Sequence, residues 1–348
     1  MLPSPKMAST REAYQILEPR PYPRRLSLVA PMYNEEESVP YLRAEITPSL
    51  DAMSCECELI LVNDGSTDET LRLIADWSRT DARVKVIQLS RNFGHQLAAT
   101  AGLDYATGDA IVLIDADLQD PLAVIHEMIA LYQQGYDVVY GQREAREGES
   151  IFKRFTAWAF YRLMRALVDR RLPVDTGDFR LISRSCYEGL QRMREQHRFL
   201  RGMVAWVGYS QTGVLYRRNP RVAGSTKYPL TKMLAFAWTA ATSFSTLPLR
   251  ISIFLGMCAG LLGIEETLRA FYALAMGHVV PGWTSLMVVT SVLSSAILIS
   301  IGIVGQYVGK IYEESKGRPL YLVARTLNVD AAQDANAQWS RAESAGRE

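Results

Sequence analysis

Two aspartates separated by one residue close an almost wholly apolar stretch of the sequence. Residues 111–114 read Ile-Val-Leu-Ile, and Asp115 and Asp117 follow them, with Gln119 and Asp120 just beyond. Such a run is typical of a strand buried on both faces, and a parallel sheet presents its ligand-binding groups where its strands end. Carboxylates so close together raise each other's pKa unless a cation neutralises them. The pattern therefore predicts a divalent metal that joins the pair to an anionic substrate such as a diphosphate.

Two further polar clusters follow apolar runs. Residues 31–37 read Pro-Met-Tyr-Asn-Glu-Glu-Glu, and residues 62–68 read Val-Asn-Asp-Gly-Ser-Thr-Asp. Taken alone, each also fits an ordinary turn with a helix cap. Together with Asp115 and Asp117 they place acidic clusters at neighbouring strand ends of one sheet. Such an edge suits ribose hydroxyls, a base edge and a metal-bridged diphosphate.

The elements that must position these clusters alternate between strand and helix. Strand candidates recur at regular intervals, at residues 26–31, 58–64, 84–90, 110–115 and 137–141, with helical patterns between them. This alternation predicts an α/β fold with a mostly parallel, Rossmann-like sheet and right-handed connections.

Composition limits the other possibilities. The chain has 348 residues and a net charge of +1, which argues against a general nucleic-acid binder. Its four cysteines have no metal-binding or redox spacing, as expected for structural thiols in a reducing compartment. Residues 1–23 contain no apolar core, so we expect a flexible N-terminal tail and no cleavable signal peptide.

Two apolar stretches in the C-terminal part are long enough to cross a bilayer, which takes about 20 residues. Residues 247–264 contain one charged residue, Arg250, and residues 283–308 contain none, so we predict membrane helices at about 247–269 and 283–308. The connector between them lacks Lys and Arg, whereas basic residues flank the outer ends. This bias places both termini, including a C-terminal tail at 309–348, in the cytosol.

Residues 151–171 combine aromatic and aliphatic bulk with six Lys or Arg residues. This combination favours an amphipathic helix at the membrane interface, although a helix packed on the sheet with its arginines in water also fits. Residues 229–246 similarly predict a juxtamembrane helix. Two spans are too few for a pore, so they are expected to act as an anchor. Self-association of such an anchor stays an open alternative.

The motifs as a set resemble those of membrane-anchored GT-A glycosyltransferases of the family-2 type, particularly polyisoprenyl-phosphate glycosyltransferases similar to dolichol-phosphate mannose synthase. The resemblance covers roughly residues 26–322 and rests on the following stretches: Pro31-x-Tyr-Asn-Glu, Asn63-Asp-Gly-Ser-x-Asp68, Arg91-Asn-Phe-Gly94, Asp115-Ala-Asp-Leu-Gln-Asp-Pro121, Thr176-Gly-Asp-Phe-Arg180 and Gly224-Ser-Thr-Lys-Tyr228. Asn63 stands where many relatives have Asp. The resemblance implies a GT-A catalytic domain at residues 24–228.

The resemblance also implies roles for individual residues. The nucleoside would be held by Pro31, Tyr33, Glu35, Asp64 and Asp115. Mg²⁺ or Mn²⁺ would be held against the donor diphosphate by Asp115, Asp117 and Gln119. A mobile segment carrying Arg221 and Lys227 would close over the donor phosphates, and Asp178 would be the catalytic carboxylate.

Donor and acceptor are both anions, so basic side chains are required near the reacting atoms. Arg143, after the fifth predicted strand, is the first candidate for the acceptor phosphate, with Lys153 and Arg154 assisting. Each of the three also fits an ordinary solvated surface.

The chemistry of the acceptor bears on Asp178. A phosphate monoester is mostly dianionic at neutral pH and needs little help from a general base. We therefore expect Asp178 to orient the acceptor or take a residual proton, while the metal stabilises the leaving group. A turn cap after Gly177 is the alternative for this aspartate.

The predicted function is inverting transfer of a single sugar from a nucleotide donor, UDP-glucose first, to undecaprenyl or dolichyl phosphate at the cytosolic face of a membrane, most simply the bacterial inner membrane. A processive polysaccharide synthase is one alternative, but the Gln-x-x-Arg-Trp motif that it would need is absent. A catalytically silent membrane adaptor is another. The acids Asp64, Asp115, Asp117 and Asp178 count against it.

Overall fold

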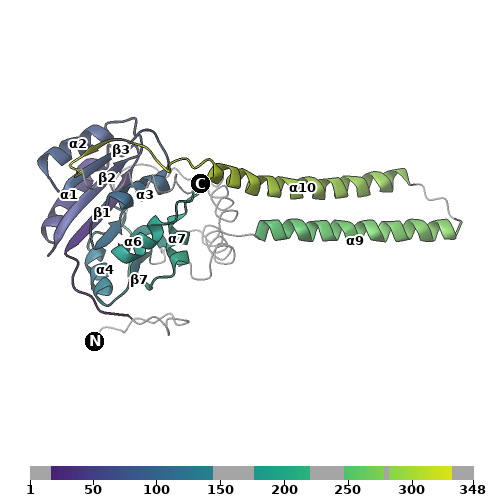
Figure 1. Cartoon of the computed structure of the whole chain (residues 1–348), viewed down its shortest axis with the longest axis horizontal. Helices are drawn as coiled ribbons and strands as arrows, with labels where there is room; N and C mark the ends of the chain where they lie inside the picture. The colour runs from purple at the N-terminus through teal and green to yellow at the C-terminus, as the bar shows by residue number, and fades with distance from the viewer. Residues whose placement is uncertain (1–16, 144–175, 220–246, 278–281, 331–348) are drawn as a thin grey trace. The chain divides into compact units, whose positions relative to one another are not determined.

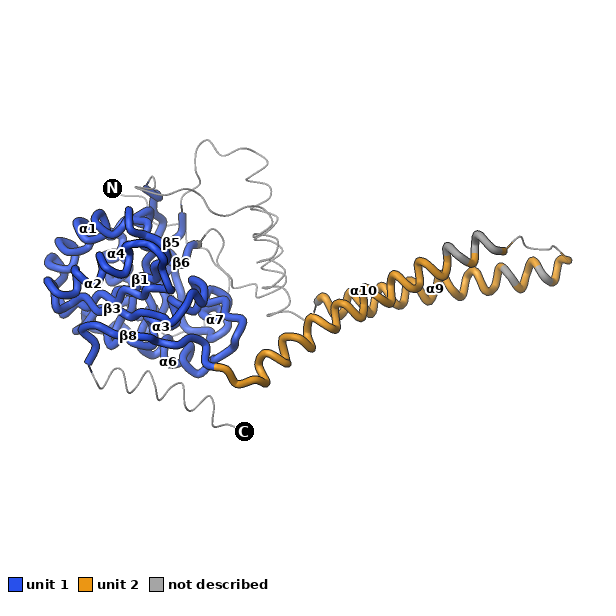
Figure 2. The backbone as a smooth tube through the Cα atoms, turned by 90° about the horizontal axis from the view of Figure 1, so that it is seen from above, with its two compact units in different colours: residues 1–153, 173–226, 319–348 blue, residues 154–172, 227–318 orange. Residues whose placement is uncertain are grey.

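The computed structural model describes residues 17–143, 176–219, 247–277 and 282–330 (Figure 1). The described residues fall into two compact units, 17–143 with 176–219 and 319–330, and 247–277 with 282–318 (Figure 2). Several predictions lie outside the described residues: the helices at 151–171 and 229–246, and the phosphate ligands Lys153, Arg154, Arg221 and Lys227.

The first unit is built on one sheet, whose described strands run in the order β7-β5-β6-β4-β1-β2-β3-β8. The strands are β1 (Arg25–Met32), β2 (Glu56–Asn63), β3 (Val84–Leu89), β4 (Ala110–Leu113), β5 (Val138–Arg143), β6 (Thr176–Ser183), β7 (Gln211–Tyr216) and β8 (Val323–Leu327). Strand β1 pairs in parallel with β2 and β4, β2 pairs in parallel with β3, and β5 pairs in parallel with β7. The expected mostly parallel α/β sheet is confirmed. Two strands run the other way: β6 is antiparallel to β4 and β5, and β8 is antiparallel to β3.

Helices cover the sheet, and its central strands are buried on both faces (Figure 1). The helices of this unit are α1 (Val39–Asp51), α2 (Thr70–Thr80), α3 (His95–Tyr105), α4 (Val124–Gln133), α6 (Arg184–Gln191) and α7 (Leu200–Val207). In β1, the neighbours Leu28 and Val29 point to opposite faces, and both are fully buried. Val29 lies opposite Ile60 of β2 and Leu113 of β4. This register brings the carboxyl ends of the three strands to one edge.

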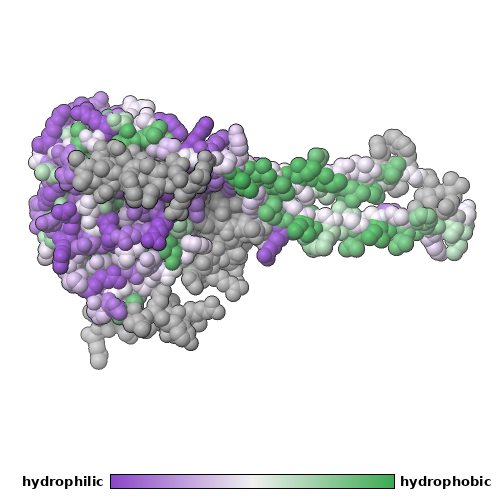
Figure 3. Space-filling model, viewed as in Figure 1, coloured by the Kyte–Doolittle hydropathy of each residue, from purple (hydrophilic) through white to green (hydrophobic). Residues whose placement is uncertain are grey.

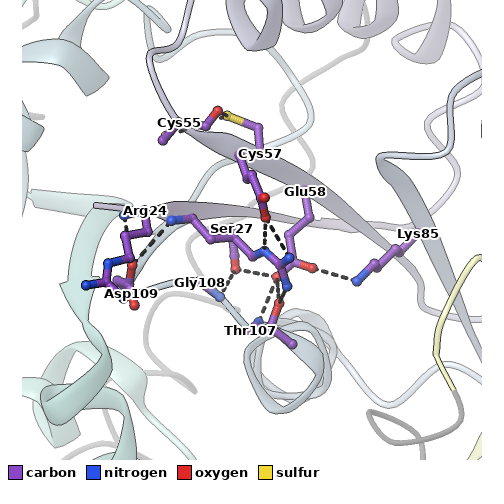
Figure 4. Close-up of polar contacts among 11 residues, drawn as sticks. Arg24, Ser27, Cys55, Cys57, Glu58, Lys85, Thr107, Gly108 and Asp109 are labelled. Atoms are coloured by element: carbon purple, nitrogen blue, oxygen red, sulfur yellow. Dashed lines mark hydrogen bonds and ion pairs between the residues drawn. The ribbon is translucent and has the colours of Figure 1, made fainter. Parts of the chain in front are cut away.

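The amino ends of the same strands are joined by a buried polar network (Figure 4). Glu58 of β2 accepts hydrogen bonds from Ser27 Oγ in β1 at 2.5 Å and from Lys85 Nζ in β3 at 2.7 Å. The same carboxylate accepts the backbone N–H of Thr107 at 2.7 Å, in the loop before β4. Strands β1, β2 and β3 and the loop that leads into β4 are therefore tied together at the end opposite the site.

The second unit consists of two long helices, α9 (Leu247–Ala275) and α10 (Trp283–Ser315). Their most apolar stretches, Pro248–Ala273 and Val289–Ser315, have mean hydropathies of 1.6 and 1.8 and few buried residues. Apolar side chains lie along both helices (Figure 3), which pack side by side. Ser300 Oγ of α10 donates to the carbonyl of Ser252 in α9 at 3.5 Å. The prediction of two helices of membrane-spanning length is confirmed, and both continue beyond the expected ends at 269 and 308.

The segment expected to be a C-terminal tail at 309–348 is different in the structure. Helix α10 runs on to Ser315, and β8 then pairs with β3 at the edge of the sheet. Tyr321 is 2% exposed, and its hydroxyl donates to Asp104 of α3 at 2.6 Å. The prediction was wrong for this part because β3 offers an edge with unpaired backbone groups, which a short strand can satisfy.

The N-terminal segment is also attached over part of the predicted tail at 1–23. The guanidinium of Arg20 donates to the carbonyl of Gly135 at 2.7 Å and to Asp137 at 3.0 Å. Residues 17–23 therefore belong to the first unit.

Candidate active site

The strand register places the predicted acidic residues along one edge of the sheet. Tyr33 and Asp64 directly follow β1 and β2, and Asp115 lies two residues beyond the end of β4, at the same edge. Strand β6 begins at this edge because it runs antiparallel to β4, with Arg180 opposite Leu113. Asp178 therefore approaches Asp115 although the two residues are far apart in the sequence.

Asp178 lies at the centre of a group of donors from two helices. Its carboxylate, 8% exposed, accepts Arg201 Nε of α7 at 2.7 Å and Gln96 Nε2 of α3 at 3.2 Å, and His95 Nε2 lies 3.3 Å away. Burial alone would raise the pKa of Asp178, but the charge of Arg201 and the hydrogen bonds from His95 and Arg201 hold it well below its usual range. The Asp178 side chain is therefore ionised at neutral pH.

His95, to which the sequence analysis gave no role, stands between two predicted functional groups. Its Nε2 atom lies 3.3 Å from Asp178 and 3.8 Å from Oδ1 of Asp115. Burial would lower the pKa of His95, but the hydrogen bond to Asp178 and the charges of both aspartates raise it. Since its side chain is 42% exposed, an incoming substrate can reach it.

The loop after β4 holds the predicted metal ligands close together. Burial raises the pKa of Asp115 to about 6. The charge of His95 lowers this pKa, whereas the charges of Asp178, Asp120 and Asp117 raise it further. Asp117 Oδ1 accepts the backbone N–H of Gln119 at 3.2 Å, which fixes the turn. The Gln119 side chain is buried at the same turn.

These acids fit a divalent cation whose remaining ligands come from a substrate. Within the described ranges, no three His, Cys, Asp or Glu side chains form a complete metal cage. Mg²⁺ usually takes one or two carboxylates and completes its shell with phosphates and water. Burial is the main cause of the raised pKa of Asp115, and the nearby carboxylates Asp178, Asp120 and Asp117 add to it. Asp120 Oδ2 is also buried with no hydrogen-bond partner among the residues that the structure describes.

The predicted nucleoside ligands differ in how accessible they are. Tyr33 is 43% exposed and offers its ring at the edge, whereas Pro31 is buried within β1. Glu35 accepts the hydroxyl of Ser38 at 2.8 Å. Asp64 is 2% exposed, and its oxygens accept the backbone N–H groups of residues 93 and 94 at 2.7 and 2.9 Å. Asp64 thus holds the loop between β3 and α3.

Arg143 reaches the same site from the end of β5. Its guanidinium lies so close to Gly177 that a Cβ there would come within 2.6 Å of Nη2. Burial would lower the pKa of Arg143, but a hydrogen bond with Tyr216 and the charge of Asp120 raise it. The structure therefore brings Arg143 against Gly177, the residue before Asp178, whereas the other predicted phosphate ligands lie outside the described residues.

Sequence reasoning missed several residues of this site: His95, Gln96, Arg201 and Arg218. The first two directly follow the Arg91-Asn-Phe-Gly94 motif, which was a usable signal. Arg201 and Arg218 belong to no motif, and only the fold brings them to the acids.

Comparison with known proteins gives matches over most of the chain. Residues 27–190 match the family model described as "Glycosyl transferase family 2". The "Uncharacterized glycosyltransferase YkcC" of Bacillus subtilis (strain 168) is 44% identical over 87% of this chain and 94% of its own length. The "Prophage bactoprenol glucosyl transferase homolog" of Escherichia coli (strain K12) is 38% identical over 86% and 99%. A solved structure of the mannosyltransferase PcManGT from Pyrobaculum calidifontis, in complex with GDP-Man and Mn²⁺, covers 83% of this chain and 91% of its own, with 16% identity and a TM-score of 0.44.

Proposed function

The chain belongs to glycosyl transferase family 2, and on that premise we propose that it transfers one glucose from UDP-glucose to a polyisoprenyl phosphate at a membrane. The observation that carries this proposal is the match to proteins named bactoprenol glucosyl transferases. They are 37–38% identical to this chain, which covers 98–99% of their length. Similarity over that length includes the region of α9 and α10 as well as the catalytic edge.

The site supports the donor half of the proposal. Asp115, Asp117 and Gln119 would hold Mg²⁺ or Mn²⁺ at the edge of the sheet, and Pro31, Tyr33, Glu35 and Asp64 would hold the nucleoside. When bound, the metal would stabilise negative charge on the departing nucleotide diphosphate. Arg221 and Lys227 stay predicted ligands of the same phosphates.

The acceptor half rests on the surroundings of Asp178. A phosphate oxygen would attack C1 of the sugar from the face opposite the diphosphate, so that the new C1–O bond forms as the old one breaks and the configuration inverts. The leaving diphosphate takes the bonding electrons, and a dianionic acceptor has no proton to lose. Asp178, held ionised by Arg201, would orient Arg201 and His95 toward the acceptor. Arg143, Lys153 and Arg154 are the proposed ligands of its phosphate.

The two apolar helices would hold the catalytic unit at the bilayer where the lipid phosphate emerges. Basic residues lie at their outer ends, with Arg250 in the first turn of α9 and Lys310 and Lys316 at the end of α10, whereas the connector has none. This distribution favours a cytosolic location for both termini and the catalytic unit.

The test is a transfer assay with the full-length protein in detergent. The protein is incubated with Mg²⁺, undecaprenyl phosphate and radiolabelled UDP-glucose, with GDP-mannose and UDP-galactose in parallel. We expect one lipid product with a single glucose, formed only with metal. A product with several sugars would favour a processive synthase, and no lipid product from any donor would refute the proposal.

A further inference from the structure

Arg218 lies among the predicted metal ligands, although no motif pointed to it. It follows β7, and its side chain is 16% exposed. Its Nη2 atom lies 3.8 Å from Asp117 Oδ2, and its Nε atom lies 3.5 Å from Asp120 Oδ1. The preceding residue, Arg217, is exposed. One of two adjacent arginines is thus directed into the acidic cluster.

The contacts of Arg218 are close enough for charge attraction but too long for good hydrogen bonds. Its Nε is buried without a hydrogen-bond partner in the described part of the chain, and so is Nε of Arg143. Burial and the nearby charge of Arg143 both lower the pKa of Arg218. Two guanidinium groups held near each other with unused donors are suited to an anion that offers several oxygen acceptors.

The backbone next to Arg218 is fixed. The N–H of Asn219 donates to the carbonyl of Gln119 at 2.8 Å, which ties this segment to the loop that carries Asp117. The side chain can therefore change partners by rotation about its own bonds, without movement of the segment away from the site.

We infer that Arg218 serves as a substitute cation for Asp117 and Asp120 in the substrate-free protein, and that it becomes a ligand of the donor diphosphate when a divalent metal binds Asp117. The inference rests on the proposed function, because it requires a nucleotide diphosphate as donor. A metal at Asp117 removes the attraction that holds Arg218 there and repels its positive charge. The diphosphate then supplies the acceptors that Arg218 lacks.

If the role of the Arg218 ion pair were purely structural, the effect of its removal on metal affinity would be the opposite. If Arg218 only kept the loop in shape, its removal would leave Asp117 less well placed and weaken the metal site. If Arg218 competes with the metal, its removal makes Mn²⁺ alone bind more tightly while a nucleotide diphosphate binds more weakly. The two effects have opposite signs, and loss of structure cannot produce both.

The experiment measures Mn²⁺ binding to the full-length protein in detergent from the electron paramagnetic resonance signal of free Mn²⁺. Wild type is compared with Arg218→Gln, and with Arg217→Gln as the matched control at the neighbouring exposed position. UDP binding is then measured at saturating Mn²⁺, with GDP in parallel. For Arg218→Gln we expect about tenfold tighter Mn²⁺ and about tenfold weaker UDP, each equal to ~1.4 kcal/mol. Arg217→Gln should change neither.

A second variant, Arg218→Lys, keeps the charge but loses the planar fork. It should bind Mn²⁺ as wild type does and UDP more weakly, with a melting temperature near that of wild type. An unchanged or weakened Mn²⁺ affinity in Arg218→Gln, or an unchanged affinity for UDP, overturns the inference. If wild type binds neither UDP nor GDP, the proposed function fails, while tighter Mn²⁺ binding by Arg218→Gln still supports the competition.

Discussion

The role of Asp178 can be separated from that of the metal ligands by two substitutions of the same kind. Asp178→Asn and Asp117→Asn each remove one negative charge and keep the size of the side chain. Asp178 is held by Arg201 and Gln96 and lies beside His95, so we expect it to act by orienting these groups. Asp117 would act through the metal, on which departure of the diphosphate depends.

The structure allows an estimate of the two losses. A hydrogen bond to a charged group contributes about 1.5–3 kcal/mol, so Asp178→Asn should lower kcat about 10- to 150-fold if its main effect is to release Arg201. A catalytic metal contributes several kcal/mol, so Asp117→Asn should cost about 1,000-fold or more. Melting temperatures of both variants serve as the control, because Asp178→Asn also removes a counter-charge from the buried Arg180, 3.9 Å away.

The assay is the pH profile of kcat at saturating metal. Because the pKa of Asp178 lies well below its usual range, this group stays ionised from about pH 5 upward and gives no limb in the profile. The acid limb of the profile should follow the second ionisation of the acceptor phosphate, near pH 6. In Asp178→Asn the limb should stay at the same pH, and only the plateau value of kcat should be lower. If the limb vanishes in Asp178→Asn, the aspartate is a general base. A smaller loss in Asp117→Asn than in Asp178→Asn would also refute the reasoning.

Three further results are expected from the full-length protein. Glu58→Gln breaks a buried ion pair with Lys85 and should destabilise by about 3–5 kcal/mol at neutral pH, seen as a lower melting temperature. Burial opposes the ionisation of Glu58, but the hydrogen bonds from Lys85, Ser27 and the Thr107 backbone together outweigh it and lower the pKa. This stabilisation is therefore present above the unfolded pKa and lost as the pH falls through the folded one. The difference from wild type should therefore shrink in melts near pH 3, roughly, and a constant difference would contradict the assignment. Tyr321→Phe removes a hydrogen bond to the Asp104 carboxylate and should cost about 1.5–3 kcal/mol in urea unfolding, whereas an unchanged midpoint would mean that the segment contributes nothing there. Gly65→Ala places a Cβ 2.6 Å from the backbone of the next loop at a φ of +67°, so we expect a lower melting temperature and a raised KM for the donor, and a variant that matches wild type in both would show that the loop can shift.

The sequence predicted the part of the site that depends on where strands end. Asp115 directly follows an apolar run, Asp64 follows one after Asn63, and parallel register brings such positions to one edge. It could not predict the partners that arrive from elsewhere. Arg201 reaches Asp178 because β6 runs antiparallel to β4, and a single strand does not reveal its direction by its residue pattern. Strand β8 was missed for a similar reason, since a short, partly charged segment becomes a strand only beside the open edge of β3.

Helix α3 connects two features that the sequence did not predict: the donors around Asp178 and the attachment of the segment after α10. Helix α3 begins with His95 and Gln96 at the catalytic edge and carries Asp104 in its last turn. Asp104 is held by Arg194 at 2.7 Å, by Tyr187 at 2.8 Å and by Tyr321 at 2.6 Å. The chain that leaves α10 is thus bonded to the same helix that supplies two neighbours of Asp178. Because a helix transmits a shift along its axis, we expect removal of residues 319–330 to disturb the donors around Asp178 as well as the edge of the sheet. Loss of β8 should therefore lower kcat, and not only stability, at temperatures where the truncated protein is still folded.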